Sequence, residues 1–317
     1  MPDNDLVTIC ITTYSRKNLV VNTVKSVQNQ TYRNIEIIVV DDASIDETED
    51  VLKSFIQGDS RIKYLKHSEN RGLAAARNTA IFNASGKYFS FIDDDDEWDS
   101  TYIEEFVQLV QNYDENWCFC CGFIQNNRNF VPDFEGTLKD IIYQGYTPPV
   151  AGQFYFLNTV KAVNGYNEDI NSGVDHDLWI KLAIKGIKIK SLKKALAIPN
   201  NDSNQGRMTI NYNKRIRGIQ QSLDIWKDDI YKHFGEKFYK HFRNNYIYHI
   251  HKKVLLSHIK NKSLFESIFY FFLQPEKIRF MKDLSIIITR KHSKISKTNK
   301  KLNYVILPVF KTFKYKS

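Results

Sequence analysis

An acidic run is the feature of the sequence that points most directly to chemistry. Residues 93–96 are four consecutive aspartates, which follow the apolar stretch Tyr88–Ile92 and precede Glu97 and Trp98. Adjacent carboxylates repel one another unless a cation or solvent screens their charge. Mg²⁺ and Mn²⁺ prefer oxygen ligands, and Mg²⁺ is usually held by one or two carboxylates together with substrate phosphates. The run therefore indicates a metal–diphosphate site, and the alternative is a solvated acidic turn.

Three more polar segments occur where an apolar run ends. They are Thr12-Thr13-Tyr14-Ser15, Asp41-Asp42-Ala43-Ser44 and the segment from Asn70 to Asn78. Ligands of open α/β sheets bind beyond the carboxyl ends of the strands, so these segments are the first places to expect a ligand. The chain has neither a G-x-G-x-x-G nor a G-x-x-x-x-G-K-[ST] segment, which argues against a dinucleotide cofactor and a P-loop.

The elements that would position these residues alternate along the first 200 residues. Apolar and β-branched runs predict strands at Val7–Thr12, Ile35–Val40, Ile62–Lys66, Tyr88–Ile92 and Trp117–Ile124. Helical spacing of apolar residues predicts helices at Leu19–Asn29, Glu47–Ile56, Ala74–Asn83, Thr101–Tyr113 and Asp175–Lys185. Such alternation predicts an α/β fold with a mostly parallel sheet flanked by helices. Residues 125–150 are expected to be loop-rich, and the chain beyond residue 200 is expected to be helical.

In this order and spacing, the polar segments resemble the nucleotide-sugar-binding half of family 2 glycosyltransferases with the GT-A fold. The family's Pro-Thr-Tyr-Asn, Val-Asp-Asp-Gly-Ser-x-Asp, Asn-x-Gly-x(3)-Ala-Arg-Asn and Asp-x-Asp-Asp-x-Trp motifs match the segments that contain Thr12, Val40, Asn70 and Asp93. The resemblance covers roughly residues 6–200. It implies a Rossmann-like GT-A catalytic domain over residues 1–200, followed by a helical, basic region over residues 201–317.

The resemblance also implies roles in donor binding. Thr13 and Tyr14 would lie beside the nucleotide base, and Asp42 would accept a hydrogen bond from a uracil-type base. Asp95 would bind the Mn²⁺ or Mg²⁺ that bridges the diphosphate, and Arg77 would approach the nucleotide or diphosphate. The full set implied for the donor is Thr12, Thr13, Tyr14, Asp42, Arg77, Asp93 and Asp94. Capping, turn formation and an ion pair within a helix are the alternatives for the aspartates and for Arg77.

A second matching segment implies the acceptor side. Asp175 matches the first aspartate of the family's Glu-Asp-x-Asp-Leu-Trp segment, which implies that it is the catalytic base, although Val174 stands where the family commonly has Glu. An inverting transfer needs a carboxylate within reach of the acceptor hydroxyl, opposite the leaving diphosphate. The alternative for Asp175 is a helix N-cap, and Asp177 is the reserve candidate. Gly165 and Tyr166, in a turn that resembles the family's Gly-Phe-Asp-Glu, would lie with Asp177 on the acceptor side.

Charge is divided unevenly between the two parts of the chain. Residues 1–200 have a net charge of −8, and residues 201–317 have a net charge of +17. Lysines interleaved with aromatic residues beyond residue 277 suit an anionic membrane surface, and a basic subdomain that packs on the catalytic domain is the alternative. No stretch of about 18 uninterrupted apolar residues is present, and the start does not resemble a signal peptide. These features predict a cytoplasmic protein that associates peripherally with the inner face of the cytoplasmic membrane.

Together these features predict a metal-dependent, inverting glycosyltransferase. It would move a sugar from a nucleotide donor, UDP-linked by expectation, to a hydroxyl of a lipid-linked or growing surface glycan such as O-antigen or capsule. One alternative is a sugar-nucleotide nucleotidyltransferase, although residues 12–17 lack the glycine expected of its loop. The other is a non-enzymatic protein that binds anionic membranes or nucleic acid, and the acidic first half argues against nucleic acid. Three of the 4 cysteines lie at Cys118, Cys120 and Cys121, where buried thiols are expected.

Overall fold

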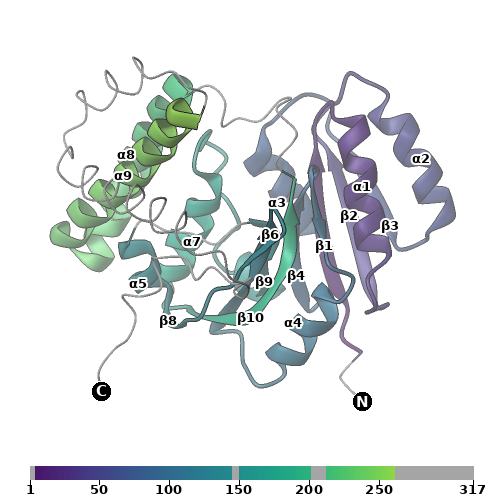
Figure 1. Ribbon diagram of the computed structural model, residues 1–317, viewed down its shortest axis with the longest axis horizontal. Coiled ribbons are helices and arrows are strands. Elements are labelled where there is room, and N and C mark those ends of the chain that lie inside the picture. The colour runs from purple at the N-terminus through teal and green to yellow at the C-terminus, as the bar shows by residue number, and fades with distance from the viewer. Residues whose placement is uncertain (1–3, 145–149, 201–211, 261–317) are drawn as a thin grey trace, which may run out of the picture.

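The computed structural model describes residues 4–144, 150–200 and 212–260. Residues 263–317, which contain most of the basic and aromatic segment behind the membrane hypothesis, lie outside the described residues. Figure 1 shows a central sheet with helices on its faces, with α1 and α2 at one side of the molecule and α8 and α9 at the other. The fold is therefore α/β, as the alternating sequence pattern predicts.

In the described residues the strands form one 10-stranded sheet. Along its main path the order is β3-β2-β1-β4-β9-β6-β10-β5. The strands are β1 (Val7–Thr13), β2 (Ile35–Asp41), β3 (Ile62–Lys66), β4 (Tyr88–Asp93), β5 (Asp96–Trp98), β6 (Trp117–Gln125), β7 (Arg128–Phe130), β8 (Glu135–Thr137), β9 (Gln153–Phe156) and β10 (Lys188–Pro199). The strands β1 to β4 pair in parallel, whereas β9 runs antiparallel to both β4 and β6.

The helices connect these strands and extend beyond them. They are α1 (Lys17–Gln28), α2 (Thr48–Gly58), α3 (Leu73–Asn83), α4 (Tyr102–Val110), α5 (Leu138–Tyr143), the short 3₁₀ turn η1 (Val150–Gly152), α6 (Leu157–Lys161), α7 (Val174–Ile184), α8 (Tyr212–Phe234) and α9 (Glu236–Lys260). The segment 125–150, expected to be loop-rich, contains the short elements β7, β8 and α5 in its described part. Runs of only three to six residues are too short to give a periodic signal.

Strand register brings the polar segments together. In the parallel pairing of β1 with its two neighbours, Thr12 lies opposite Asp93 of β4 and opposite Val40 of β2, and Thr13 lies opposite Asp41. The carboxyl ends of β1, β2 and β4 therefore meet at one edge of the sheet. The polar segments that follow these three strands emerge at this edge.

Two apolar layers cover the two faces of the sheet. Alternate residues of β1 point to opposite faces: Ile9 and Ile11 pack with the residues of α1 and α4, whereas Cys10 packs with the alanines of α3. Side chains as small as alanine let α3 approach the sheet closely. All four cysteines are buried free thiols, which confirms the expectation for Cys118, Cys120 and Cys121.

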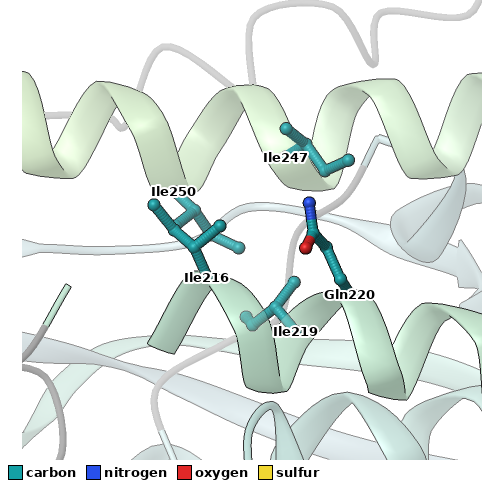
Figure 2. A pocket seen from close by; sticks show the side chains of 5 residues that line it. All are labelled: Ile216, Ile219, Gln220, Ile247 and Ile250. Atoms are coloured by element: carbon teal, nitrogen blue, oxygen red, sulfur yellow. The ribbon is translucent and has the colours of Figure 1, made fainter. Parts of the chain in front are cut away.

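The helices α8 and α9 pack against each other and share the apolar layer of α3 and α7. Figure 2 shows a small pocket between them that is lined by Ile216, Ile219, Gln220, Ile247 and Ile250. None of the helices in the described part of the chain is both long and apolar enough to cross a lipid bilayer.

Candidate active site

The acidic run lies at the carboxyl end of β4, where it meets the segment that follows β1. Asp94 is buried, and its carboxylate accepts hydrogen bonds from Thr13 Oγ1 at 2.7 Å and from Arg16 Nη1 at 2.5 Å. Arg16 Nη2 lies 3.4 Å from Asp95 Oδ2. Burial raises the pKa of Asp94 to about 6, although Arg16 and Thr13 oppose that shift. A cation therefore already faces the carboxylates expected to serve the donor and the metal.

Arg77, in α3, joins the donor-side carboxylate Asp93 to the acceptor-side carboxylate Asp175. Its side chain is 1% exposed, and its guanidinium lies beside the rings of Phe91 and Tyr166, 5.3 Å and 5.5 Å from their centres. Arg77 Nη1 donates to Asp175 Oδ1 at 2.5 Å, and Nη2 donates to Asp93 Oδ1 at 2.9 Å. Burial lowers the pKa of Arg77, but the carboxylates of Asp175 and Asp93 outweigh burial, so the pKa rises. The guanidinium stays charged and connects β4 to α7.

Asp42 organises the loop that opens α3. Its buried carboxylate accepts hydrogen bonds from the backbone N–H groups of Arg71 at 2.9 Å and Gly72 at 2.8 Å, and it lies 2.7 Å from His67 Nδ1. Gly72 has φ of +87°, a conformation that favours glycine. The glycine of the Asn-x-Gly motif is thus required by the turn that presents two backbone donors to Asp42.

The remaining residues expected at the donor differ in exposure. Thr12 and Thr13 are buried in β1, whereas Tyr14 is 44% exposed just beyond the strand. The Ser15 N–H donates to Ser44 Oγ at 2.8 Å, and the Ile45 N–H donates to Ser15 Oγ at 3.2 Å. These reciprocal bonds hold the loops after β1 and β2 together, and they leave the Tyr14 ring available for stacking.

On the opposite side of Arg77, Asp175 occupies the first turn of α7. Gly173, with φ of +80°, is the N-cap of this helix, and no side chain makes a capping hydrogen bond there. The N-cap alternative for Asp175 therefore does not describe this structure. Its side chain is 35% exposed while one oxygen contacts Arg77. A carboxylate in this position is both oriented and open to an incoming hydroxyl.

Asp177 lies on the other face of α7, because residues two positions apart in an α-helix are separated by about 200° around its axis. It is 2% exposed, and its carboxylate accepts from the Asn167 N–H at 2.6 Å and from Trp226 Nε1 at 3.0 Å and pairs with Lys181 Nζ at 3.1 Å. The structure brings Asp175, and not Asp177, to Arg77 and Asp93. The reserve candidate holds the helices together instead of facing the site.

Gly165 and Tyr166 also lie inside the protein rather than on an open acceptor surface. Tyr166 is 4% exposed. Its backbone N–H donates to Asn78 Oδ1 at 2.8 Å, and its carbonyl oxygen accepts from Asn78 Nδ2 at 2.9 Å. Gly165 has φ of +55°, and a Cβ atom there would lie 2.4 Å from Asn78 Oδ1. This turn therefore fixes Arg77 and α3 against the start of α7.

Sequence reasoning missed two polar residues that the structure brings into the site, Arg16 and His67. The signal for Arg16 is weak, because an arginine between a strand and a helix gives no hint of its partner, which directly follows the neighbouring strand β4. His67 follows β3, and its contact with Asp42 could have been suspected from the parallel pairing of β2 with β3. Both contacts depend on tertiary geometry rather than on a local pattern.

The oxygen ligands at the end of β4 fit a hard divalent cation. No group of three or more His, Cys, Asp or Glu side chains in the described residues is arranged to hold a metal ion by itself. Carboxylates of Asp94 and Asp95 nevertheless converge on one cationic group, the guanidinium of Arg16. Since Mg²⁺ commonly combines one or two carboxylates with substrate phosphates, this donor set suits a metal that binds together with a diphosphate.

Comparisons with known proteins agree with this geometry. The family model described as "Glycosyl transferase family 2" matches residues 8–159. The UDP-Glc:alpha-D-GlcNAc-diphosphoundecaprenol beta-1,3-glucosyltransferase WfaP of Escherichia coli is 41% identical over 189 residues, which cover 59% of this chain and 74% of WfaP. Glycosyltransferase GlyA of Streptococcus pneumoniae is 39% identical over 35% of this chain, and the chain spans only 16% of its length.

Solved structures share the fold at low sequence identity. TarS of S. aureus, residues 1–349 in complex with UDP-GlcNAc, superposes with a TM-score of 0.59 at 18% identity over 76% of this chain and 70% of TarS. The mannosyltransferase PcManGT of Pyrobaculum calidifontis, in complex with GDP-Man and Mn²⁺, superposes with a TM-score of 0.57 at 16% identity over 94% of this chain and 90% of PcManGT. The family match, the WfaP alignment and the shared architecture show that this chain belongs to glycosyltransferase family 2 and has the GT-A fold.

Proposed function

We propose that this protein transfers a sugar, with inversion, from a UDP-linked donor to a hydroxyl of a lipid-linked or growing surface glycan. The donor and acceptor classes are supported by WfaP, whose name states a UDP-Glc donor and a diphosphoundecaprenol-linked acceptor. The fold is also that of TarS, which has been solved with UDP-GlcNAc. The order of the polar motifs along the chain agrees with this assignment.

One observation carries the proposal: Arg77 joins Asp93 at the end of β4 to Asp175 at the start of α7. A carboxylate on the donor side and a carboxylate on the acceptor side therefore share one buried cation, and their separation is fixed by a side chain that is 1% exposed. Fixed geometry of this kind is what a transfer between two bound substrates requires.

In the proposed reaction Asp175 is the general base. Its Oδ1 is held by Arg77, and its partly exposed carboxylate removes the proton from the acceptor hydroxyl as that oxygen attacks the anomeric carbon. Arg77 orients the carboxylate, because its Nη1 donates to Asp175 Oδ1 at 2.5 Å. We therefore propose that Arg77 positions the base Asp175, a role different from the diphosphate contact expected from sequence.

We propose that Asp95 and Asp94 hold a divalent cation together with the diphosphate of the donor. Bound there, Mn²⁺ or Mg²⁺ would neutralise the departing diphosphate and make it a better leaving group. Tyr14 would stack on the nucleotide base, with Thr12 and Thr13 beside it, and Asp42 would accept from a uracil-type base after local adjustment of the Gly72 turn. Asp93 would face the ribose and the donor sugar.

We further propose that residues 1–200 form the catalytic part and that the basic residues of 201–317 bring it to an anionic membrane surface. The charge of +17 over residues 201–317 supports this division. A lipid-linked acceptor would then be concentrated where the enzyme is held.

The test is release of the nucleoside diphosphate by the purified full chain from a panel of UDP- and GDP-sugars, with Mn²⁺ or with EDTA, in the presence of a diphosphoundecaprenol-linked glycan. We expect release from one or two UDP-sugars, and loss of that release in EDTA. Activity confined to GDP-sugars would refute the UDP assignment, and full activity in EDTA would refute the metal. If no sugar nucleotide in the panel releases its nucleotide and UDP with Mn²⁺ does not raise the melting temperature, the donor site itself is refuted.

A further inference from the structure

Arg16 occupies the carboxylates that the proposed donor and metal would use. Its Nη1 lies 2.5 Å from Asp94 Oδ1, and its Nη2 lies 3.4 Å from Asp95 Oδ2. The side chains of Asp94 and Asp95 are only 5% and 9% exposed. Ion pairs of this burial are screened far less by water and salt than surface pairs.

The backbone around Arg16 is held by the neighbouring loop. Ser15 has φ of 51°, an uncommon conformation for a residue other than glycine. It is fixed by the reciprocal bonds with Ser44 and Ile45, and the Lys17 N–H donates to Asp46 Oδ2 at 3.2 Å. Arg16 is thus the residue between two anchored neighbours at the start of α1, and its side chain reaches Asp94, directly after the neighbouring strand β4. The contact is built into the loop and does not depend on a freely mobile surface chain.

The two arginines of the site, Arg16 and Arg77, differ in whether they can move away from the carboxylates that they bind. Arg77 is 1% exposed, contacts the rings of Phe91 and Tyr166, and is bonded to Asp93 and Asp175, so it cannot move without opening the core. The Arg16 side chain is 19% exposed and sits at the rim, where a change of rotamer suffices. A divalent cation at Asp95 must compete with the Arg16 guanidinium, since two positive groups cannot share one carboxylate without mutual repulsion.

A nucleoside diphosphate changes this competition. Guanidinium groups bind phosphate oxygens through the same kind of parallel hydrogen bonds that they make to carboxylates. We propose that Arg16 couples metal binding to nucleotide binding: it holds Asp94 and Asp95 until the diphosphate arrives, then moves to the phosphate oxygens and leaves the carboxylates to the metal. The inference rests on the proposed donor and metal site, and it concerns the order in which that site is filled.

The coupling is a measurable ratio. It is the dissociation constant of Mn²⁺ without UDP divided by the dissociation constant of Mn²⁺ with saturating UDP, and by linkage the same factor describes how Mn²⁺ changes the affinity for UDP. If Arg16 opposes Mn²⁺ only in the absence of the diphosphate, removing its charge strengthens binding of Mn²⁺ alone and reduces this ratio.

The experiment measures free Mn²⁺ by electron paramagnetic resonance in the full chain, with and without UDP. In Arg16→Gln we expect Mn²⁺ alone to bind about tenfold more tightly and the coupling ratio to fall about tenfold, within the usual span of such couplings. Arg16→Lys keeps a positive charge but loses the planar fork, so we expect a coupling ratio between the two. Lys17→Gln is the matched control, because it removes one positive charge from the adjacent residue, which pairs with the exposed Glu47; its ratio should equal that of the unchanged protein.

The outcomes separate this inference from the function on which it rests. If the unchanged protein shows Mn²⁺–UDP coupling and Arg16→Gln and Arg16→Lys show the same coupling, the role of Arg16 is refuted while the donor site stands. An equal fall in Lys17→Gln would also refute it, because general charge would then explain the effect. If the unchanged protein binds neither Mn²⁺ nor UDP, the donor site is refuted and this inference with it.

Discussion

Arg16 and Arg77 differ in how far solvent can reach them, and their roles follow from that difference. Arg77 is 1% exposed and bridges Asp93 and Asp175, so it serves as a fixed part of the site. The side chain of Arg16 lies at the rim and is 19% exposed. We therefore propose that the buried arginine sets the geometry of the site and that the partly exposed one responds to ligands.

Replacing Asp175 tests the base assignment at this scale. Asp175→Asn keeps an oxygen that can accept from Arg77 but cannot take up the acceptor proton. We expect the turnover rate to fall by about 10²–10⁴-fold, while the free energy of unfolding falls by only about 1–2 kcal/mol. Steady-state kinetics and urea denaturation of the same preparation would measure both. Turnover close to that of the unchanged protein would show that another group removes the proton.

Ala43 offers a test of the loop after β2. It adopts φ of 64° at the position where the family's motif has glycine. A residue with a Cβ atom in the left-handed region costs roughly 1–2 kcal/mol, so Ala43→Gly should raise the free energy of unfolding by about 1 kcal/mol, because the flexibility gained by the unfolded chain offsets part of the relief.

The matched control for Ala43 is the same substitution in a helix. Ala80 is buried in α3, and Ala80→Gly should lower the free energy of unfolding by about 1 kcal/mol or more. Urea denaturation of the two variants would show opposite signs. If both variants lose stability, the strain assigned to Ala43 is absent.

Among the elements, α7 presents two aspartates to different neighbours. Asp175 faces Arg77, and Asp177 faces Trp226 of α8 and the turn at Asn167. Sequence reasoning placed Asp177 on the acceptor side as the reserve candidate for the base, and it could not say which of the two aspartates would meet the site. That choice depends on where α8 packs.

Asp177→Asn should therefore affect stability more than chemistry. The amide offers one acceptor oxygen where the carboxylate served three donors, so we expect the free energy of unfolding to fall by about 2 kcal/mol. The Michaelis constant for the donor should stay unchanged in the fraction that remains folded. Trp226→Phe, which removes the indole donor from the same bond, should lower stability in the same direction. A large rate loss without loss of stability would instead return Asp177 to the list of candidate bases.

Glu36 of β2 gives the fold a defined sensitivity to acid. Burial alone would raise its pKa, but hydrogen bonds from Lys63, Ser85 and Thr8 outweigh burial and lower the pKa to about 2. A carboxylate with a lowered pKa in the folded state stabilises the protein above its pKa in the unfolded chain, and this contribution is lost as the pH falls toward 2.

The loss corresponds to about 3 kcal/mol when complete. We expect the free energy of unfolding to decrease between pH 5 and pH 3 in the unchanged protein, and to decrease less in Glu36→Gln. Urea titrations at pH 7, 5, 4 and 3 would measure the two slopes. Equal slopes would show that other carboxylates dominate acid unfolding.

For the whole molecule, the first four strands, their helices and the meeting of the polar segments could be predicted from sequence. Parallel strands with intervening helices leave little topological choice, so Thr12, Asp42 and Asp93 had to emerge at one edge. The antiparallel insertion of β9 could not be predicted, because Gln153–Phe156 is a buried run of 4 residues without alternation. Nor could the pairing of Arg16 with Asp94, since it arises only once the sheet has formed.

The membrane hypothesis also belongs to the whole molecule. Because residues 201–317 have a net charge of +17, the full chain should sediment with vesicles that contain phosphatidylglycerol at low ionic strength. It should be released at 1 M salt, where the Debye length falls to about 3 Å, and it should not sediment with phosphatidylcholine vesicles. Equal sedimentation with both vesicles at all salt concentrations would argue against electrostatic attachment.

The link that Arg77 makes also bears on how the protein is synthesised. Arg77 and Asp175 are 98 residues apart in the chain. A ribosome-bound chain that has emerged only as far as β5 already carries the residues proposed for the donor, but it lacks the base. Such a chain could bind a sugar nucleotide before it could hydrolyse it. Activity would therefore begin only when α7 has docked and the fold is nearly complete.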